Sequence, residues 1–263
     1  MPSSALYVAR TGLAAQDTRM QVIANNLANV STTGFKRDRA NFATLAYQDA
    51  RVAGAQSSGQ TTYATGLNLG TGVAIQSTST DMAQGSMQST GNSLDMAISG
   101  EGYFQVTMPD GTLGYTRAGN FTTSSEGLLV TAQGYPVQPQ ITIPQGASAI
   151  TVGPDGTVSA VVAGSAQATQ LGQITTATFA NPAALKPAGD NFYAETTGSG
   201  APQVAAAGAT GHGAVRQGYL EASNVSVVTE LVDMIETQRA YEINSKMVSS
   251  VDEMLKNANQ TLS

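Results

Sequence analysis

The chain has 263 residues and a formal net charge of −6 at pH 7. It is long enough to bury a sizeable core, and its negative balance argues against general nucleic-acid binding. The absence of Cys and the single His, His212, exclude disulfides and thiolate chemistry and leave little room for a zinc site or a His-dependent triad. Only 11% of the residues are charged, while Ser, Thr, Asn and Gln make up about a third of the chain. This balance is typical of a turn-rich protein with many water-facing strands.

The two ends of the chain and its middle differ in proline content. After Pro2, all eight remaining prolines lie between positions 109 and 202. Because proline breaks helix interiors, both ends are free to be helical and the middle is not.

The N-terminal end carries an apolar residue at every seventh position: Leu6, Leu13, Met20 and Leu27. This spacing predicts an amphipathic helix over about residues 3–28 with a coiled-coil-like stripe. The first sequence block, residues 1–45, contains this helix. No basic segment precedes its apolar residues, so we expect no cleaved secretory signal.

The C-terminal block, residues 223–263, repeats the spacing at Val227, Met234, Tyr241, Val248 and Leu255. It predicts a second heptad helix, with Asn224 or Ser226 as its cap. We call the nine heptad residues of both ends the assembly seam.

Charge favours pairing of these two helices. Residues 1–42 hold five basic and two acidic residues, whereas residues 221–263 hold three basic and seven acidic ones. The entropy lost by ordering one such helix is about as large as the gain from burying a single apolar stripe. Each helix is therefore expected to be marginal alone and stable in a larger assembly.

Residues 46–81 are expected to form an extended connector with local strand character. The 29 positions between Arg51 and Asp81 carry no charge and no helical period. Tyr47, Gln56, Gln60 and Tyr63 are its candidate contact residues.

Residues 82–222 alternate short apolar runs with turn signals. Pro109-Asp110-Gly111 and Pro154-Asp155-Gly156 each separate strand-like runs, and Pro-Asp-Gly favours a tight turn. The fold class expected is α+β, with paired N- and C-terminal coiled-coil helices and an antiparallel β-rich domain inserted between them.

The segment IANNLANVSTTGF, residues 23–35, has a simple interpretation as a helix stop. It also resembles the N-terminal signature of the bacterial flagellar rod and hook axial proteins, through Asn25, Asn26, Asn29, Gly34 and Phe35. Residues 223–246 (SNVSVVTELVDMIETQRAYEINSK) resemble the C-terminal signature of that family, and residues 98–106 and 115–121 its β-domain blocks. The resemblance spans nearly the whole chain.

This resemblance implies a structural role without a cofactor. The subunit would assemble with itself into a helical homopolymer whose terminal helices line an export channel. Its other implied partners are proximal rod and hook proteins, the surrounding P and L rings and the flagellar type III export apparatus, which secretes subunits without signal cleavage. It implies neither nucleic-acid binding nor membrane insertion.

Within the family, the length and residues 47–66 favour a distal rod subunit over the longer hook protein, with a proximal rod subunit as the nearest alternative. An extracellular β adhesin with helical oligomerisation ends is a second class, disfavoured by the lack of Trp. An enzyme is a distant third, because no nucleophile and base are paired in the sequence. His212 is interpreted as a loop residue, and Lys36 to Arg39 as the solvated start of a helix.

Overall fold

The computed structural model describes residues 2–58, 60–162 and 167–261. The chain forms two compact units. The helical unit comprises Met1–Leu27, Asp38–Ser79 and Val227–Ser263, and the β unit comprises Ala28–Arg37 and Thr80–Ser226. These divisions follow residues 27, 37, 79 and 226, whereas the sequence blocks are bounded at residues 45, 81 and 222, so residues 38–45 and nearly all of the connector lie in the same unit as the helices.

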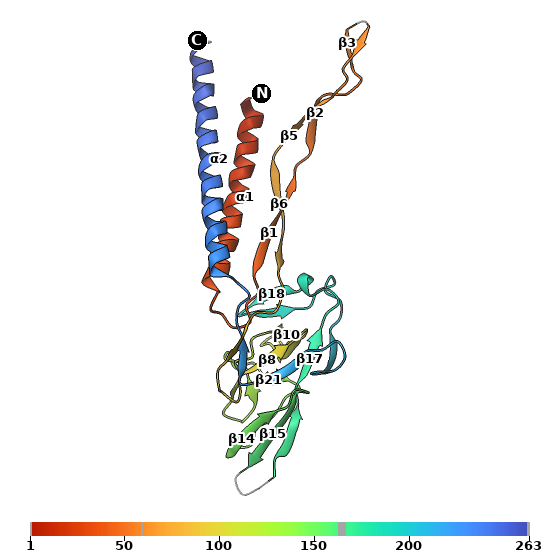
Figure 1. The fold of residues 1–263 in the computed structure, drawn as a ribbon, viewed down its shortest axis with the longest axis vertical. Helices are drawn as coiled ribbons and strands as arrows, with labels where there is room; N and C mark the ends of the chain where they lie inside the picture. Colours follow the sequence, from red (N-terminus) through yellow and green to blue (C-terminus); the bar gives the residue numbers. More distant parts are fainter. Residues whose placement is uncertain (1, 59, 163–166, 262–263) are drawn as a thin grey trace. The chain divides into compact units, whose positions relative to one another are not determined.

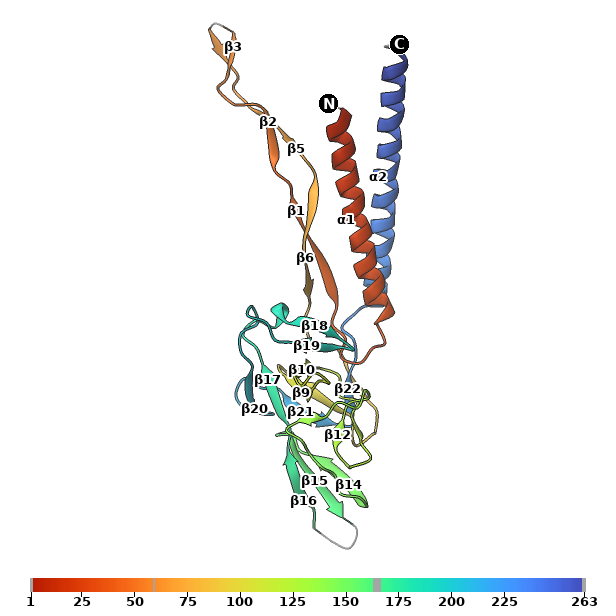
Figure 2. The ribbon, with the colours of Figure 1, turned by 180° about the vertical axis from the view of Figure 1, so that it is seen from behind.

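Two long helices dominate the helical unit. Helix α1 runs over Pro2–Ala28 and helix α2 over Val227–Thr261, as the heptad spacing predicts. They lie side by side within this unit (Figures 1 and 2). Contacts of Gly12 with Asn244 and of Asn26 with Glu230 show that they run antiparallel.

The segment expected to be an extended connector forms most of a narrow β arm, which also lies in the helical unit. We use "the arm" for strands β1 to β6, which form three successive pairs. The pairs are β1 (Asp38–Thr44) with β6 (Val73–Thr80), β2 (Tyr47–Arg51) with β5 (Leu67–Gly70), and β3 (Gln56–Ser58) with β4 (Thr61–Thr62). The pair of strands β1 and β6 runs alongside α1 within this unit (Figure 2). Isolated two-stranded ribbons are marginally stable, so contacts such as the one from Val73 N to Thr11 Oγ1 (3.4 Å) help to hold it.

The β unit is built around a seven-stranded sheet. Its strands, in spatial order, are β18 (Lys186–Gly189), β19 (Phe192–Ala194), β10 (Leu113–Thr116), β9 (Tyr103–Thr107), β17 (Thr175–Thr178) and β20 (Gln203–Ala206), with β13 (Val137–Gln138) also paired to β9. The strand pairs within this sheet are antiparallel, as the turn-rich sequence predicts.

Smaller sheets and one short 3-10 helix complete the β unit. A three-stranded sheet contains β14 (Ala147–Val152), β15 (Thr157–Val162) and β16 (Thr169–Gln173). Three antiparallel pairs are β8 (Met96–Ser99) with β21 (Ala214–Gln217), β7 (Met87–Ser89) with β22 (Tyr219–Glu221), and β11 (Thr122–Thr123) with β12 (Leu129–Val130). The 3-10 helix η1 spans Pro182–Ala184.

Strand β9 is buried on both faces, which places it at the centre of the unit. Phe104 and Val106 join one apolar cluster, and Tyr103, which points to the opposite face, joins a second cluster with Tyr115 and Tyr193. The β unit therefore encloses its own core.

The predicted Pro-Asp-Gly turns are confirmed. Asp110 Oδ1 accepts hydrogen bonds from Thr112 N at 3.0 Å and Thr112 Oγ1 at 2.6 Å, and Gly111 has a φ of +80°. Asp155 accepts from Thr157 N on Oδ1 at 3.1 Å and from Thr157 Oγ1 on Oδ2 at 2.7 Å. Glycine is suited to this left-handed conformation because it has no Cβ.

Candidate functional site

The assembly-seam residues are mostly half-buried in the single subunit. Leu6, Leu13, Met20, Leu27, Met234, Val248 and Leu255 are half-buried, while Val227 and Tyr241 are exposed. Asn26, Glu230 and Thr237, which lie on other rows of the two helices, are more deeply buried. The role of the seam in assembly stays a prediction.

Polar residues form an ion pair and a hydrogen bond between α1 and α2. Arg19 Nη2 lies 3.3 Å from Asp233 Oδ1, and the Asn26 amide donates to Glu230 Oε2 at 3.2 Å. At position 12, a Cβ would stand 3.2 Å from Asn244 Nδ2, so glycine lets the two helices approach there. The pairing therefore depends on polar fit as well as on apolar burial.

Most of these contact positions fall on heptad rows that hydrophobicity does not reveal. Positions 12, 19 and 26 of α1 and positions 230, 237 and 244 of α2 are each seven residues apart. Glu230 and Thr237 are fully buried, whereas Val227, in the seam row, is exposed. Sequence reasoning missed these rows because it followed apolar side chains. The seven-residue spacing of the polar residues was the available signal.

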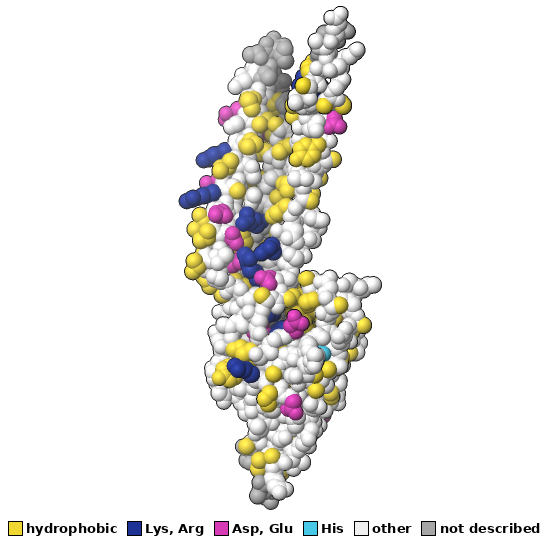
Figure 3. Space-filling model, turned by 45° about the vertical axis from the view of Figure 1, so that its right-hand side comes forward, with side chains coloured by type: hydrophobic (Ala, Val, Ile, Leu, Met, Phe, Trp, Pro, Cys, Tyr) yellow, Lys and Arg dark blue, Asp and Glu magenta, His cyan; other side chains and the backbone are white. Residues whose placement is uncertain are grey.

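Large apolar side chains of α2 remain exposed on the helical unit. Val228 is 73% exposed, Ile243 62% and Val232 51%. Figure 3 shows hydrophobic side chains on the helical unit interspersed with charged ones. A helix covered on one side only keeps an apolar surface that another protein surface can bury.

Asn26 is a junction of the helical unit. Its side chain is 1% exposed; the amide nitrogen donates to Asp38 O at 2.8 Å, and the amide oxygen accepts from Asp38 N at 2.9 Å. The same nitrogen also donates to Glu230 Oε2. Asn26 thus connects α1 with both the first arm strand and α2, and an apolar residue could supply none of these bonds.

The other signature residues form the turn after α1. Asn25 is exposed, while Asn29 O and Oδ1 accept hydrogen bonds from Thr32. Gly34 has a φ of +68°, and a Cβ there would stand 2.7 Å from Arg117 C. The half-buried Phe35 follows, with its nitrogen donating to Thr32 O at 3.2 Å. Gly34 therefore allows the chain to approach the backbone of the β unit closely.

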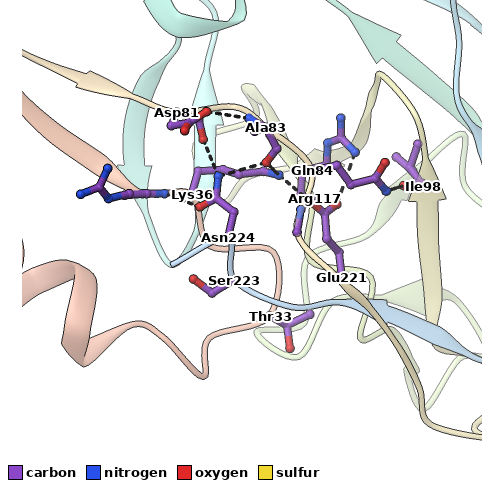
Figure 4. Close-up of polar contacts among 12 residues, drawn as sticks. Thr33, Lys36, Asp81, Ala83, Gln84, Ile98, Arg117, Glu221, Ser223 and Asn224 are labelled. Atoms are coloured by element: carbon purple, nitrogen blue, oxygen red, sulfur yellow. Dashed lines mark hydrogen bonds and ion pairs between the residues drawn. The ribbon is translucent and has the colours of Figure 1, made fainter. Parts of the chain in front are cut away.

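A buried ion cluster lies directly after this turn (Figure 4). We define it as Lys36, Arg117 and Glu221. Lys36 Nζ lies 2.5 Å from Glu221 Oε1, and Arg117 Nη1 lies 3.3 Å from Glu221 Oε2. The three side chains are at most 5% exposed. The interpretation of Lys36 as part of a solvated helix start is wrong, because this side chain is buried and residues 38–44 form strand β1.

Backbone groups complete the surroundings of the cluster. Lys36 Nζ also donates to Ala83 O at 2.8 Å, and Gly85 N donates to Glu221 Oε1 at 2.9 Å. Burial lowers the pKa of Lys36, and Glu221 opposes that shift. Burial raises the pKa of Tyr103, whose ring faces the Arg117 guanidinium at 5.1 Å. The geometry of the cluster holds these charges in place.

The connector residues lie on the arm. Tyr47, Gln56 and Gln60 are exposed. Tyr63 is 36% exposed, and the guanidinium carbon of Arg51 stands 4.0 Å from the centre of its ring. Their predicted contacts with neighbouring subunits stay a prediction.

Within the described ranges, no three His, Asp or Glu side chains gather in a way that could hold a metal ion. The described helices include none with the length and apolar character needed to cross a membrane. His212 lies in a turn, as expected, with its Nδ1 3.0 Å from Thr176 Oγ1.

Three family models match the chain. They are described as flagella basal body rod protein (residues 6–36), flagellar hook protein FlgE/F/G D1 domain (residues 97–160) and flagellar basal body rod FlgEFG protein C-terminal (residues 216–261). The flagellar basal-body rod protein FlgG of Buchnera aphidicola subsp. Acyrthosiphon pisum is 49% identical, over 97% of this chain and 98% of that protein. The chain belongs to the FlgG family of rod proteins.

A second bacterium allows FlgG and FlgF to be compared directly. The FlgG of Caulobacter vibrioides is 46% identical, over 97% of this chain and 98% of that protein. The FlgF of the same organism is 37% identical, over 98% of both. The chain is thus more similar to FlgG than to FlgF, and the resemblance to rod and hook axial proteins is confirmed.

The matched regions of this FlgG-family chain meet at the ion cluster. Lys36 lies in the first region, Arg117 in the second and Glu221 in the third. All six strands of the arm, by contrast, lie between the first two matched regions.

Proposed function

We propose that this chain is the structural subunit of the distal flagellar rod and assembles with itself into a rigid helical tube. The tube transmits motor torque to the hook and encloses the export channel. Full-length similarity to FlgG proteins, together with the exposed apolar surface of α2, carries this proposal. The rod crosses the periplasm, and its subunits leave the cell through the flagellar type III apparatus without signal cleavage.

Helical growth requires contacts that do not close. A surface of one subunit must bind a different surface of the next, since a self-complementary contact ends at a dimer. Exposed side chains of α2 such as Val228 and of α1 such as Tyr7 (54% exposed) supply two different apolar surfaces. We infer that α1 and α2 pair as a coiled coil and that other copies cover these surfaces in the tube.

The ends of the tube contact proximal rod and hook proteins, and its outer surface contacts the P and L rings. No cofactor is required for these roles, because each contact rests on packing and hydrogen bonds. A proximal rod role is the nearest alternative and is supported by the 37% identity to an FlgF.

We propose that the arm makes the tube rigid. Its outer part, residues 47–66, presents exposed Tyr47 and backbone edges that a neighbouring subunit can cover. A wedge of this kind would prevent subunits from sliding past one another, as they must when a tube bends.

Deleting residues 47–66 tests the proposal. The deletion leaves β1 and β6 able to pair, so we expect filaments that assemble but are curved in negative-stain microscopy. A chain of full length with Tyr47→Ser and Tyr63→Ser is the matched control for loss of contact without shortening, and we expect intermediate curvature. Deletion filaments as straight as the parent would contradict the wedge, and failure of the parent chain to polymerise would contradict the rod function.

A further inference from the structure

Three short segments join the β unit to the parts of the helical unit. The helical unit ends at Leu27, resumes over Asp38–Ser79 and resumes again at Val227. The segments that join these parts are residues 28–37, 80–86 and 221–226. We call them the neck, and all three belong to the β unit.

The backbones of the neck segments are hydrogen-bonded to one another. Gly34 N donates to Glu221 O at 2.7 Å, and Asp81 N donates to Arg37 O at 2.7 Å. Ala222 N donates to Ser86 O at 2.8 Å. Each segment therefore contacts both of the others.

Asn224 adds side-chain bonds between all three segments. Its Oδ1 accepts from Arg37 N at 2.7 Å, and its Nδ2 donates to Asp81 O at 2.9 Å and Ala83 O at 3.0 Å. These partners are backbone groups, so the bonds form only when the backbones of the three segments hold these positions relative to one another.

The ion cluster makes the same connection with charge. Lys36 comes from the first neck segment and Glu221 from the third, and each also bonds the backbone of the second, at Ala83 and Gly85. Figure 4 shows these side chains converging between the segments. Arg117 enters from the body of the β unit, next to strand β10.

We propose that Lys36 and Glu221 are positioning residues that lock the neck into one rigid joint. The joint fixes the three neck segments relative to one another within the β unit. The inference rests on the proposed rod function, because a subunit that transmits torque between its units needs a joint that does not bend. A buried ion pair contributes little net stability, and it forms only when the geometry of its two partners is well defined, which suits a positioning role.

Two charge-matched variants separate positioning from stability. Lys36→Met leaves the neutral pair of Arg117 with Glu221, and Arg117→Met leaves the neutral pair of Lys36 with Glu221. Both lose one buried cation, but only Lys36→Met removes the ion pair between the first and third neck segments. Lys36→Arg retains the charge and serves as the rescue variant.

Spin labels can report the joint in the soluble full-length monomer, because the chain has no native Cys. Ser31 in the neck and Ser125 in the turn between β11 and β12 are both exposed, and both lie in the β unit, so each is replaced by Cys. The distance distribution between them is measured by pulsed electron spin resonance. This readout is independent of polymerisation, so its result and that of the rod assay are distinguishable.

We expect one narrow distance peak in the parent, in Arg117→Met and in Lys36→Arg, and loss of that single peak in Lys36→Met. A narrow peak in Lys36→Met, or equal broadening in Arg117→Met, would overturn the proposal. Should Lys36→Met fail to fold, Asn224→Ala is measured instead, since it removes neck bonds without touching a charge. There too, broadening supports the joint and an unchanged peak overturns it.

Discussion

The two units of the molecule differ in how completely they bury their large apolar side chains. In the β unit, Phe104, Val106 and Val137 are fully buried within one chain. In the helical unit, fully buried Glu230 and Thr237 are polar, while Val228 and Ile243 face outward. The β unit therefore encloses its own core, whereas the helical unit leaves apolar surface that other subunits would cover under the proposed function.

The largest expected effect comes from placing a charge on the exposed apolar surface of α2. Val232 is half exposed in the single subunit, so Val232→Asp leaves the monomer folded. In a polymer that covers this position, burying an unpaired carboxylate costs on the order of several kcal/mol at every subunit. We expect filament formation to be abolished, as checked by sedimentation and negative-stain microscopy.

Ser250→Asp adds the same charge at an exposed polar position of α2 and is the control. We expect its filaments to form. Normal assembly of Val232→Asp would show that this surface stays open to water in the rod.

The helices were the most predictable part of the fold. The absence of proline between residues 3 and 108 and after 202, combined with heptads of Leu, Met and Val, predicted helices close to Pro2–Ala28 and Val227–Thr261. The Pro-Asp-Gly turns were equally visible, because their geometry depends on three neighbouring residues. Local signals of this kind are sufficient where local interactions decide the structure.

Long-range polar contacts were not predictable in the same way. Lys36 and Glu221 are 185 positions apart, and a basic run such as Lys36 to Arg39 ordinarily indicates a solvated surface. The strand pairing of the arm was missed for a related reason. Its Thr- and Gly-rich sequence lacks the alternation of apolar and polar residues that identifies a half-buried strand.

A smaller effect is expected inside the β unit. Glu221→Gln leaves Lys36 and Arg117 buried together without their shared carboxylate, and uncompensated buried charge costs about 3–5 kcal/mol. We expect the free energy of unfolding of this unit to fall by that amount in urea denaturation followed by circular dichroism. Glu126→Gln, in an exposed turn, is the control and should change it by less than about 0.5 kcal/mol.

Because burial lowers the pKa of Lys36, this group can release its proton, and the cost of Glu221→Gln should shrink at alkaline pH. A cost close to zero at neutral pH would contradict the buried ion cluster.

The smallest effect is a pH dependence of the stability of the β unit. The pKa of Lys36 in the folded protein lies below its ordinary value of 10.5. Between the folded and the unfolded pKa the unfolded chain binds more protons, so the stability of the unit rises with pH. Burial raises the pKa of Tyr103 and Tyr115 above 10.0, so above that pH the native state binds more protons and stability falls.

We therefore expect the urea midpoint to rise and then fall as pH increases toward and beyond 10. Glu221 and Asp81 favour the charged form of Lys36 and reduce the rise, while Arg117 adds to it. Lys36→Met should abolish the rise and preserve the fall. Retention of the rise in this variant would assign it to another group.

The contrast between the units is tested most directly by amide hydrogen exchange of the monomer and the filament, followed by mass spectrometry. In the monomer, we expect slow exchange in β9, β10 and β17 and fast exchange throughout α1 and α2, because the helices lack their polymer contacts. In the filament, α1 and α2 should become as protected as the β unit. Helices already protected in the monomer to the level of β9, with no further gain in the filament, would contradict the account.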